Sequence, residues 1–261
     1  TSVRRYPVVC RWRPDLFFTV ASLIDFQRVD NGRVSFEFPA NPLIVPQMCL
    51  RFSDIPNIGV SGRHFSAFVM VGQHALSDST NEEGYWKDRC IDLDFELLTK
   101  VFGIPKQEVV FVEDAWIGYG AFGLSLEYFV RGLEIGNAVF TEFLGDLSNY
   151  KVMERKVIDM GAGLERFTWI TQGTPTAYDC VFGTVIEKLK KNVDYDKEFF
   201  LRYAKLAGSL NLDEVPNIKI AREQVAKQLK VSADELEKKI APIEACYAIA
   251  DHARALAFAI A

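Results

Sequence analysis

Short hydrophobic runs dominate the first half of the chain and more, and they have the composition of β-strands. Residues 16–20, 48–52 and 65–71 are rich in aromatic and β-branched side chains. Residues 109–113 and the stretch around 138–140 predict two more strands. Asp, Pro, Asn and Gly residues between positions 53 and 62 mark a connecting loop. The second and third runs therefore predict a hairpin with a long loop.

Helical spacing dominates the last third of the chain. Residues 88–102 already show apolar side chains at the spacing of an amphipathic helix, and Gly103-Ile104-Pro105 ends that pattern. The Lys-rich segment 188–197 is the best candidate for a boundary, and we expect a solvated linker there. Four further helices are expected, at residues 177–191, 197–206, 221–229 and from 233 to the end.

Composition restricts the class of protein. The chain has 261 residues, of which 49% are hydrophobic and 25% charged, and its 20 Phe, 9 Tyr and 4 Trp suffice for a sizeable core. A net charge of -5 argues against a generally basic surface for nucleic acids. Five scattered cysteines without CxxC spacing favour neither disulfides nor a zinc site, and the simplest location is a reducing cytosol. No apolar run approaches the length of a membrane span, and both ends are expected to be cut from a longer protein.

The run from Asp159 to Arg166 reads DMGAGLER and is the most informative stretch of the chain. Gly161 and Gly163 would let the main chain touch a ligand or adopt positive φ. A helix beginning at Leu164 would present its N-terminus to anionic groups, and Arg166 could grip a phosphate with two hydrogen bonds. Two glycines before a helix also suit a plain turn, and an acid there suits the helix dipole. The run alone leaves both interpretations open.

A basic group flanks the predicted hairpin loop. Arg51 interrupts an apolar strand, and a charge on a sheet needs a partner. Arg63 and His64 open the next strand, so antiparallel pairing would bring them toward Arg51 at the mouth of the loop. Phe68 lies on the face of His64 by the period of two and could stack on a base or belong to the core. A polyphosphate would be a suitable partner, although surface arginines are commonly just solvated.

These strings resemble the class II aminoacyl-tRNA synthetases. The hairpin arginine followed by Arg/His-x-x-x-Phe looks like their motif 2, and Gly-x-Gly-x-Glu-Arg looks like their motif 3. Four strings together resemble the alanyl-tRNA synthetase family in its archaeal form, and they lie at residues 16–22, 57–64, 159–166 and 250–254. The match runs from about Arg5 to the end of the chain. It implies an α+β fold, with an antiparallel class II sheet flanked by helices and followed by a helical region.

The resemblance implies an ATP site. Arg51 resembles the catalytic motif 2 arginine that holds the α-phosphate and offsets charge in the transition state. Arg63 and His64 would lie on the pyrophosphate side, and Arg166 resembles the second catalytic arginine, from motif 3, near the γ-phosphate and adenine. The other ATP-binding positions that the resemblance implies are Phe68, Trp116, Ile135, Gly136, Asn137, Gly161 and Gly163.

The resemblance also implies an alanine site. Asp159 resembles the acid that pairs with the alanine ammonium, and Trp116 and Val139 resemble the walls around its methyl group. The alanine carboxylate would attack the α-phosphorus of ATP and release pyrophosphate, and the alanyl group would pass to tRNA(Ala). Mg²⁺ is expected with the ATP, and Glu127 is a candidate ligand for it.

The resemblance divides the chain into two functional parts. Residues 1–190 would form the catalytic domain, and residues 191–261 would begin the helical tRNA-recognition domain. L-Alanine and tRNA(Ala) are the expected partners, with no membrane contact. We expect a cytoplasmic monomer whose editing and oligomerisation regions would lie beyond Ala261.

Three stretches depart from the family pattern. Val69 stands where a glutamate is usual, residues 118–124, GYGAFGL, replace the usual GGGNAGP, and residues 73–76, QHAL, replace the usual HHAF. These changes keep a second hypothesis open, a non-catalytic synthetase-like module that binds tRNA or a protein partner. The matching residues favour the ligase, namely Arg51, Trp116, Asn137, Asp159 and Arg166.

Overall fold

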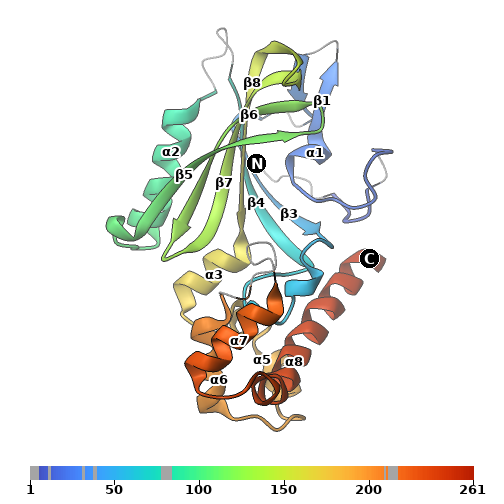
Figure 1. Cartoon of the computed structure of the whole chain (residues 1–261). Coiled ribbons are helices and arrows are strands. Elements are labelled where there is room, and N and C mark those ends of the chain that lie inside the picture. Colours follow the sequence, from blue (N-terminus) through green and yellow to red (C-terminus); the bar gives the residue numbers. More distant parts are fainter. Residues whose placement is uncertain are drawn as a thin grey trace. The chain divides into compact units, whose positions relative to one another are not determined.

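The chain folds into two compact units, seen in a computed structural model that describes residues 6–10, 13–30, 33–37, 40–77, 84–208, 210 and 217–261 (Figure 1). The first unit comprises Thr1–Cys49 and Val69–Leu164, and the second comprises Leu50–Phe68 and Glu165–Ala261. Each unit therefore draws on two separate stretches of the sequence.

A six-stranded sheet forms the centre of the first unit, in the order β3-β4-β8-β7-β6-β5 (Figure 1). Its strand pairs from β4 to β5 are antiparallel, which confirms the predicted α+β fold with an antiparallel sheet. The strands are β3 (Leu43–Leu50), β4 (Ala67–Ser77), β5 (Val109–Gly118), β6 (Ala121–Val130), β7 (Leu133–Asp146) and β8 (Asn149–Gly163).

Different elements cover the two faces of this sheet. On one face, α1 (Leu23–Phe26) packs through Phe26 against His74 of β4, with ring centroids 5.2 Å apart. A small hairpin of β1 (Gln27–Asp30) and β2 (Arg33–Phe36) follows α1 and shares its core. On the other face lies α2 (Lys87–Glu96), which continues as the π-turn η2 (Leu97–Val101) and precedes the 3-10 turn η3 (Lys106–Glu108). Successive strand residues point to opposite faces of the sheet. The elements on the two faces therefore contact different side chains of each strand.

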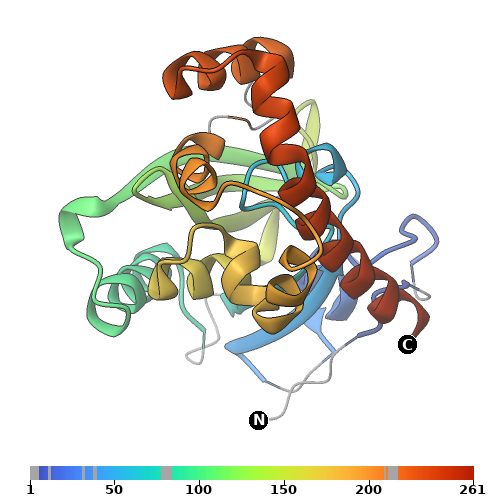
Figure 2. The same cartoon turned by 90° about the horizontal axis from the view of Figure 1, so that it is seen from below.

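Helices build the second unit around one hydrophobic core. Tyr178 and Tyr247 stack within it, with ring centroids 4.8 Å apart. The helices α5 and α8 contact each other, and Figure 2 shows α8 in dark red as a long helix of this unit. The elements are η1 (Ile55–Asn57), α3 (Leu164–Gln172), α4 (Ala177–Phe182), α5 (Thr184–Lys190), α6 (Lys197–Ala207), α7 (Ile218–Leu229) and α8 (Ala233–Ile260).

Most predicted elements are confirmed, with two corrections. Residues 16–20 form no strand but only a single bridge, between Val9 and Phe18, and Phe17 is largely exposed. The helix predicted over 177–191 is interrupted at Gly183, whose φ of 44° breaks it into α4 and α5. The segment predicted as a linker has its turn between Lys190 and Lys197. Within the described ranges, no helix has both the length and the apolar character that a bilayer span needs.

The buried acid Asp94 gives the first unit a dependence of stability on pH. Asp94 lies on α2 with its carboxylate 3.7 Å from the Cys90 thiol, and burial raises its pKa from 3.8 to about 7. Between about pH 4 and about pH 7 the folded state therefore keeps this proton, whereas the unfolded state has lost it. The contribution of Asp94 to the free energy of unfolding must fall as the pH rises from about 4 to about 7.

We predict that Asp94→Asn removes this dependence. A shift of this size corresponds to at most about 4 kcal/mol, so at pH 8 the variant should be more stable than the wild type by an appreciable part of that value. At pH 4 the two should be nearly equal. Urea unfolding at both pH values measures the difference, and an equal difference at the two values would contradict the assignment.

Candidate functional site

One face of the sheet carries most of the predicted site residues of the first unit. The strand register places His74 of β4 opposite Asp159 of β8, and Asp159 opposite Val139 of β7. Directly opposed residues of antiparallel strands share a face. Two residues further along the same face, the register lines up Gly72, Gly161, Asn137 and Glu127.

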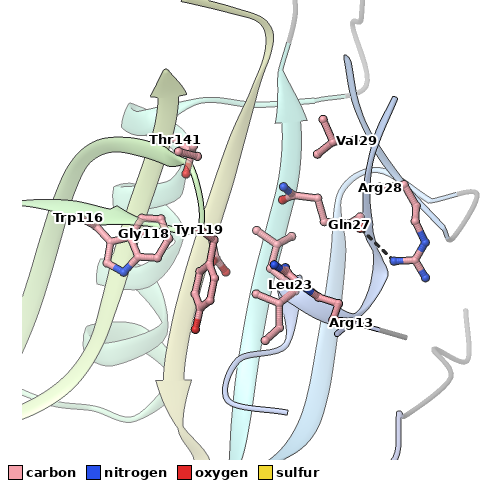
Figure 3. A pocket seen from close by; sticks show the side chains of 12 residues that line it. Arg13, Leu23, Gln27, Arg28, Val29, Trp116, Gly118, Tyr119 and Thr141 are labelled. Carbon is pink, nitrogen blue, oxygen red and sulfur yellow. Dashed lines mark hydrogen bonds between the residues drawn. The ribbon is translucent and has the colours of Figure 1, made fainter. Parts of the chain in front are cut away.

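A cavity of about 400 Å³ lies over this face, which is within the size range of small-molecule sites. Of the predicted residues, Asp159 and Trp116 line it. Figure 3 shows Trp116 and Tyr119 on one side and Arg13, Leu23 and Arg28 on the other. The complete lining is Arg13, Leu23, Ile24, Gln27, Arg28, Val29, Trp116, Gly118, Tyr119, Ala121, Thr141 and Asp159.

The stretch that replaces the glycine-rich family segment is a tight hairpin turn. Tyr119 and Gly120 have φ values of 52° and 74° and join β5 directly to β6, as in a two-residue type I′ turn. This conformation carries the Tyr119 ring to 6.1 Å from the Trp116 ring, and the Arg13 guanidinium lies 5.3 Å from the centre of the Tyr119 ring. Tyr119 is thus a wall residue of the cavity.

The adenosine-contacting stretch predicted at residues 135–137 divides between the two faces. Asn137 lies on the face of Asp159. Gly136 points the other way, where a Cβ would come within 2.4 Å of the Tyr128 hydroxyl. Ile135 is buried at a β-bulge between β6 and β7. The register therefore places Asn137 on the same face as Asp159 and Gly136 on the opposite face.

Glu127 lies on strand β6. Burial raises its pKa, and the carboxylates of Glu134 and Asp114 raise it further. Within the described part of the chain, no group of three or more His, Cys, Asp or Glu side chains could hold a metal by itself. A cation at Glu127 would relieve the repulsion among these acids.

The predicted basic group belongs to the second unit. Arg51 follows the end of β3, and its guanidinium lies 5.1 Å from the centre of the Phe68 ring. Arg63 and His64 do not open a strand, because β4 begins only at Ala67. They lie in the preceding loop, so the prediction that His64 and Phe68 share one strand face was wrong.

Positive charges surround His64. Its pKa falls to about 3, first because of burial and then because of Arg166 and Arg63. The Ser61 hydroxyl lies 2.6 Å from His64 Nδ1. The second unit therefore brings Arg63, His64 and Arg166 together, and it keeps the imidazole between the two arginines neutral near pH 7.

The run from Asp159 to Arg166 crosses from one unit to the other. The predicted helix α3 does begin at Leu164. Asp159, Gly161 and Gly163, however, lie inside β8, and neither glycine has positive φ. The interpretations of a plain turn and of a helix-terminal acid are both wrong, because the strand continues to Gly163.

The string at residues 250–254 fastens α8 within the second unit. Asp251 is fully buried and accepts the backbone N–H of Ser66 at 3.1 Å. Arg254 donates to Glu165 at 2.9 Å and to the carbonyl of Ala67. These contacts link α8 to Ser66 and the first residue of β4, and to the first turn of α3.

Comparison with known proteins identifies the family. Residues 1–261 match the family described as tRNA synthetases class II (A), so the chain belongs to this family. It is 57% identical over 262 residues to the alanine–tRNA ligase of Nitrosopumilus maritimus, covering 100% of this chain and 29% of that protein. The same enzyme of Cenarchaeum symbiosum is also 57% identical, with 99% and 29% covered. That of Methanocella arvoryzae is 43% identical, with 99% and 30% covered.

The chain thus spans about 29% of the length of the curated relatives it matches. A solved structure of a pyrrolysyl-tRNA synthetase from Desulfitobacterium hafniense covers 60% of this chain and 58% of its own, with 15% identity and a TM-score of 0.36.

The cavity reveals residues that the sequence pattern missed. Tyr119 and Arg13 line it, although neither was predicted as a site residue. The Gly-Tyr-Gly string was a signal for Tyr119, because it permits a turn with positive φ. Arg13 had no such signal, since it reaches the cavity from a segment far away in the sequence.

The environment of His64 predicts an imidazole that stays neutral over the physiological range. A pKa of about 3 in the folded state, against about 6.5 when unfolded, means that the folded imidazole binds no proton between pH 5 and 8. The stability that this neutral form contributes is lost as the pH falls below about 6.5. An NMR titration, assigned with His64→Gln, should show flat imidazole resonances, and a midpoint near 6.5 in the folded protein would refute the prediction.

Proposed function

We propose that this chain carries the adenylation site of an alanine–tRNA ligase, which activates L-alanine with ATP and transfers it to tRNA(Ala). The observation that carries the proposal is the cavity of the first unit, where Asp159 and Trp116 line the same space. A carboxylate suits the ammonium of an amino acid, and an aromatic wall suits a small apolar side chain. Relatives named alanine–tRNA ligase match along the whole chain, which supports this substrate.

The reaction needs positioning and charge neutralisation more than covalent chemistry. In this proposal Asp159 holds the alanine ammonium, and Trp116 with Val139 confines the methyl group. Arg51 and Arg166 act on the phosphates of ATP as the leaving pyrophosphate gains charge. Neutral His64 donates or accepts a hydrogen bond there without adding a third positive charge between Arg63 and Arg166.

Several further residues are proposed to contact the nucleotide. Asn137 and Gly161 share the face of Asp159, which suits contact with adenosine. Ile135, Gly136, Gly163 and Phe68 are proposed from the family pattern, and for Phe68 one supporting feature is the arginine that already lies against its ring.

Mg²⁺ is proposed as the cation that accompanies ATP. Magnesium is commonly bound through one or two carboxylates together with substrate phosphates, and the crowded acid Glu127 fits that arrangement. The ion would neutralise phosphate charge when bound.

The remaining proposals concern the whole protein. Residues 1–190 are proposed as the catalytic part and residues 191–261 as the start of the tRNA-recognition part, in a cytoplasmic monomer. The compact units divide the chain elsewhere, so this boundary is a functional one. The non-catalytic alternative rests on Val69, on residues 73–76 and on residues 118–124, and no described contact favours it.

Alanine-dependent exchange between ATP and pyrophosphate tests the proposal. The wild-type chain should catalyse this exchange, and Asp159→Asn should lower kcat/KM for alanine by about 100-fold, because the ammonium loses its counter-charge. The matched control is Asp92→Asn, which changes an exposed acid on α2. Absence of exchange in well-folded wild-type protein would refute the enzyme, and equal activity of the Asp159→Asn and Asp92→Asn variants would refute the role of Asp159.

A further inference from the structure

A fully buried histidine lies directly behind the proposed ammonium-binding acid. The His74 side chain has no exposed surface, and its Nδ1 atom lies 3.2 Å from Asp159 Oδ1. On the other side of the ring, Nε2 lies 2.9 Å from the Ser22 hydroxyl oxygen. Ser22, His74 and Asp159 thus form a chain of polar groups that ends at the cavity.

The surrounding residues are shaped around this chain. Gly72 precedes His74 on the same strand face, and a Cβ there would lie 2.2 Å from both His74 Nε2 and Ser22 Oγ. Ser22 occupies the N-cap position of α1, yet its side chain makes no capping hydrogen bond. Its hydroxyl is directed to His74 instead, although serine at an N-cap ordinarily binds a helix N–H.

The burial of the ring requires a partner for Nδ1. A buried polar atom without a hydrogen bond is costly, and Nδ1 makes no well-aligned hydrogen bond to any described residue. Asp159 Oδ1 lies within reach, and a small rotation of its carboxylate would align the bond. Asp159 itself is partly exposed and lines the cavity, so its second oxygen is the one that can meet a ligand.

We propose that His74 is a positioning residue for Asp159, and that Ser22 in turn orients His74. The inference rests on the proposed function, because it assumes that Asp159 binds the substrate ammonium. A proton on His74 Nδ1, donated to Oδ1, fixes the carboxylate with its other oxygen toward the cavity. Hydrogen bonds from residues that do not touch the ligand hold a binding group in its productive orientation.

The order of Ser, His and Asp does not make a nucleophilic triad here. The Ser22 side chain is wholly buried and the cavity lining does not include it, so its oxygen cannot attack a substrate. The polar contacts run from Ser22 through His74 to Asp159, and of these three residues only Asp159 would meet the substrate.

Kinetics of His74 variants test the proposal, with alanine and ATP varied separately in the exchange reaction. His74→Leu should raise KM for alanine at least about tenfold, since a hydrogen bond to a charged group is lost, while KM for ATP stays within about twofold. His74→Asn, whose amide nitrogen can replace Nδ1 as a donor, should recover most of the alanine affinity. Ser22→Ala should give a smaller rise of about threefold.

The controls separate positioning from folding and from the proposed function. His252→Leu changes an exposed histidine of α8 and should leave both KM values unchanged. Equal changes in the KM values for alanine and ATP, or no rescue by His74→Asn, would overturn the positioning role. If His74→Leu does not fold, the Ser22→Ala and His74→Asn variants still test the proposal. An unchanged KM for alanine in Ser22→Ala would refute the role of Ser22 in orienting His74. Inactive wild-type protein would refute the proposed function instead.

Discussion

The antiparallel pairing of β4 with β8 is the constraint on which the candidate site of the first unit depends. This register sets His74 beside Asp159 and, two residues further along, Gly72 beside Gly161. A shift by one residue would turn every one of these side chains to the opposite face, against α2 instead of the cavity. The two strands occupy inner positions of the sheet, so neighbours on both sides fix the register.

Each unit stabilises a group that burial makes unfavourable in its charged form. In the first unit the polar chain from Ser22 to Asp159 lies on one face of the sheet, whereas Asp94, whose pKa burial raises, lies on α2 at the other face. In the second unit, neutral His64 lies among arginines, and buried Asp251 is satisfied by Ser66. Buried polar groups cost stability unless they are hydrogen-bonded.

The sequence predicts periodic elements well and tertiary neighbours poorly. The helices α6 and α8 follow from their apolar spacing, and the synthetase family follows from short strings such as DMGAGLER. Residues 16–20 have the composition of a strand, but of these only Phe18 pairs in a β-bridge with another described residue, Val9, and Phe17 is exposed. The glycines at 161 and 163 suggested a turn, because the sequence does not show that β4 and β7 hold that segment extended. The sequence marks His74 only as part of a departure from the family pattern, and it does not predict the contact with Ser22, which is 52 residues away.

The protonation of His74 is the most direct test of this account. Long-range ¹H–¹⁵N correlation spectra can resolve the imidazoles, because the chain has only three histidines. We expect a proton on Nδ1 of His74, and a resonance of that nitrogen that moves in Asp159→Asn and on addition of L-alanine. An Nδ1 atom without a proton, or one whose resonance ignores the Asp159→Asn change, would contradict it.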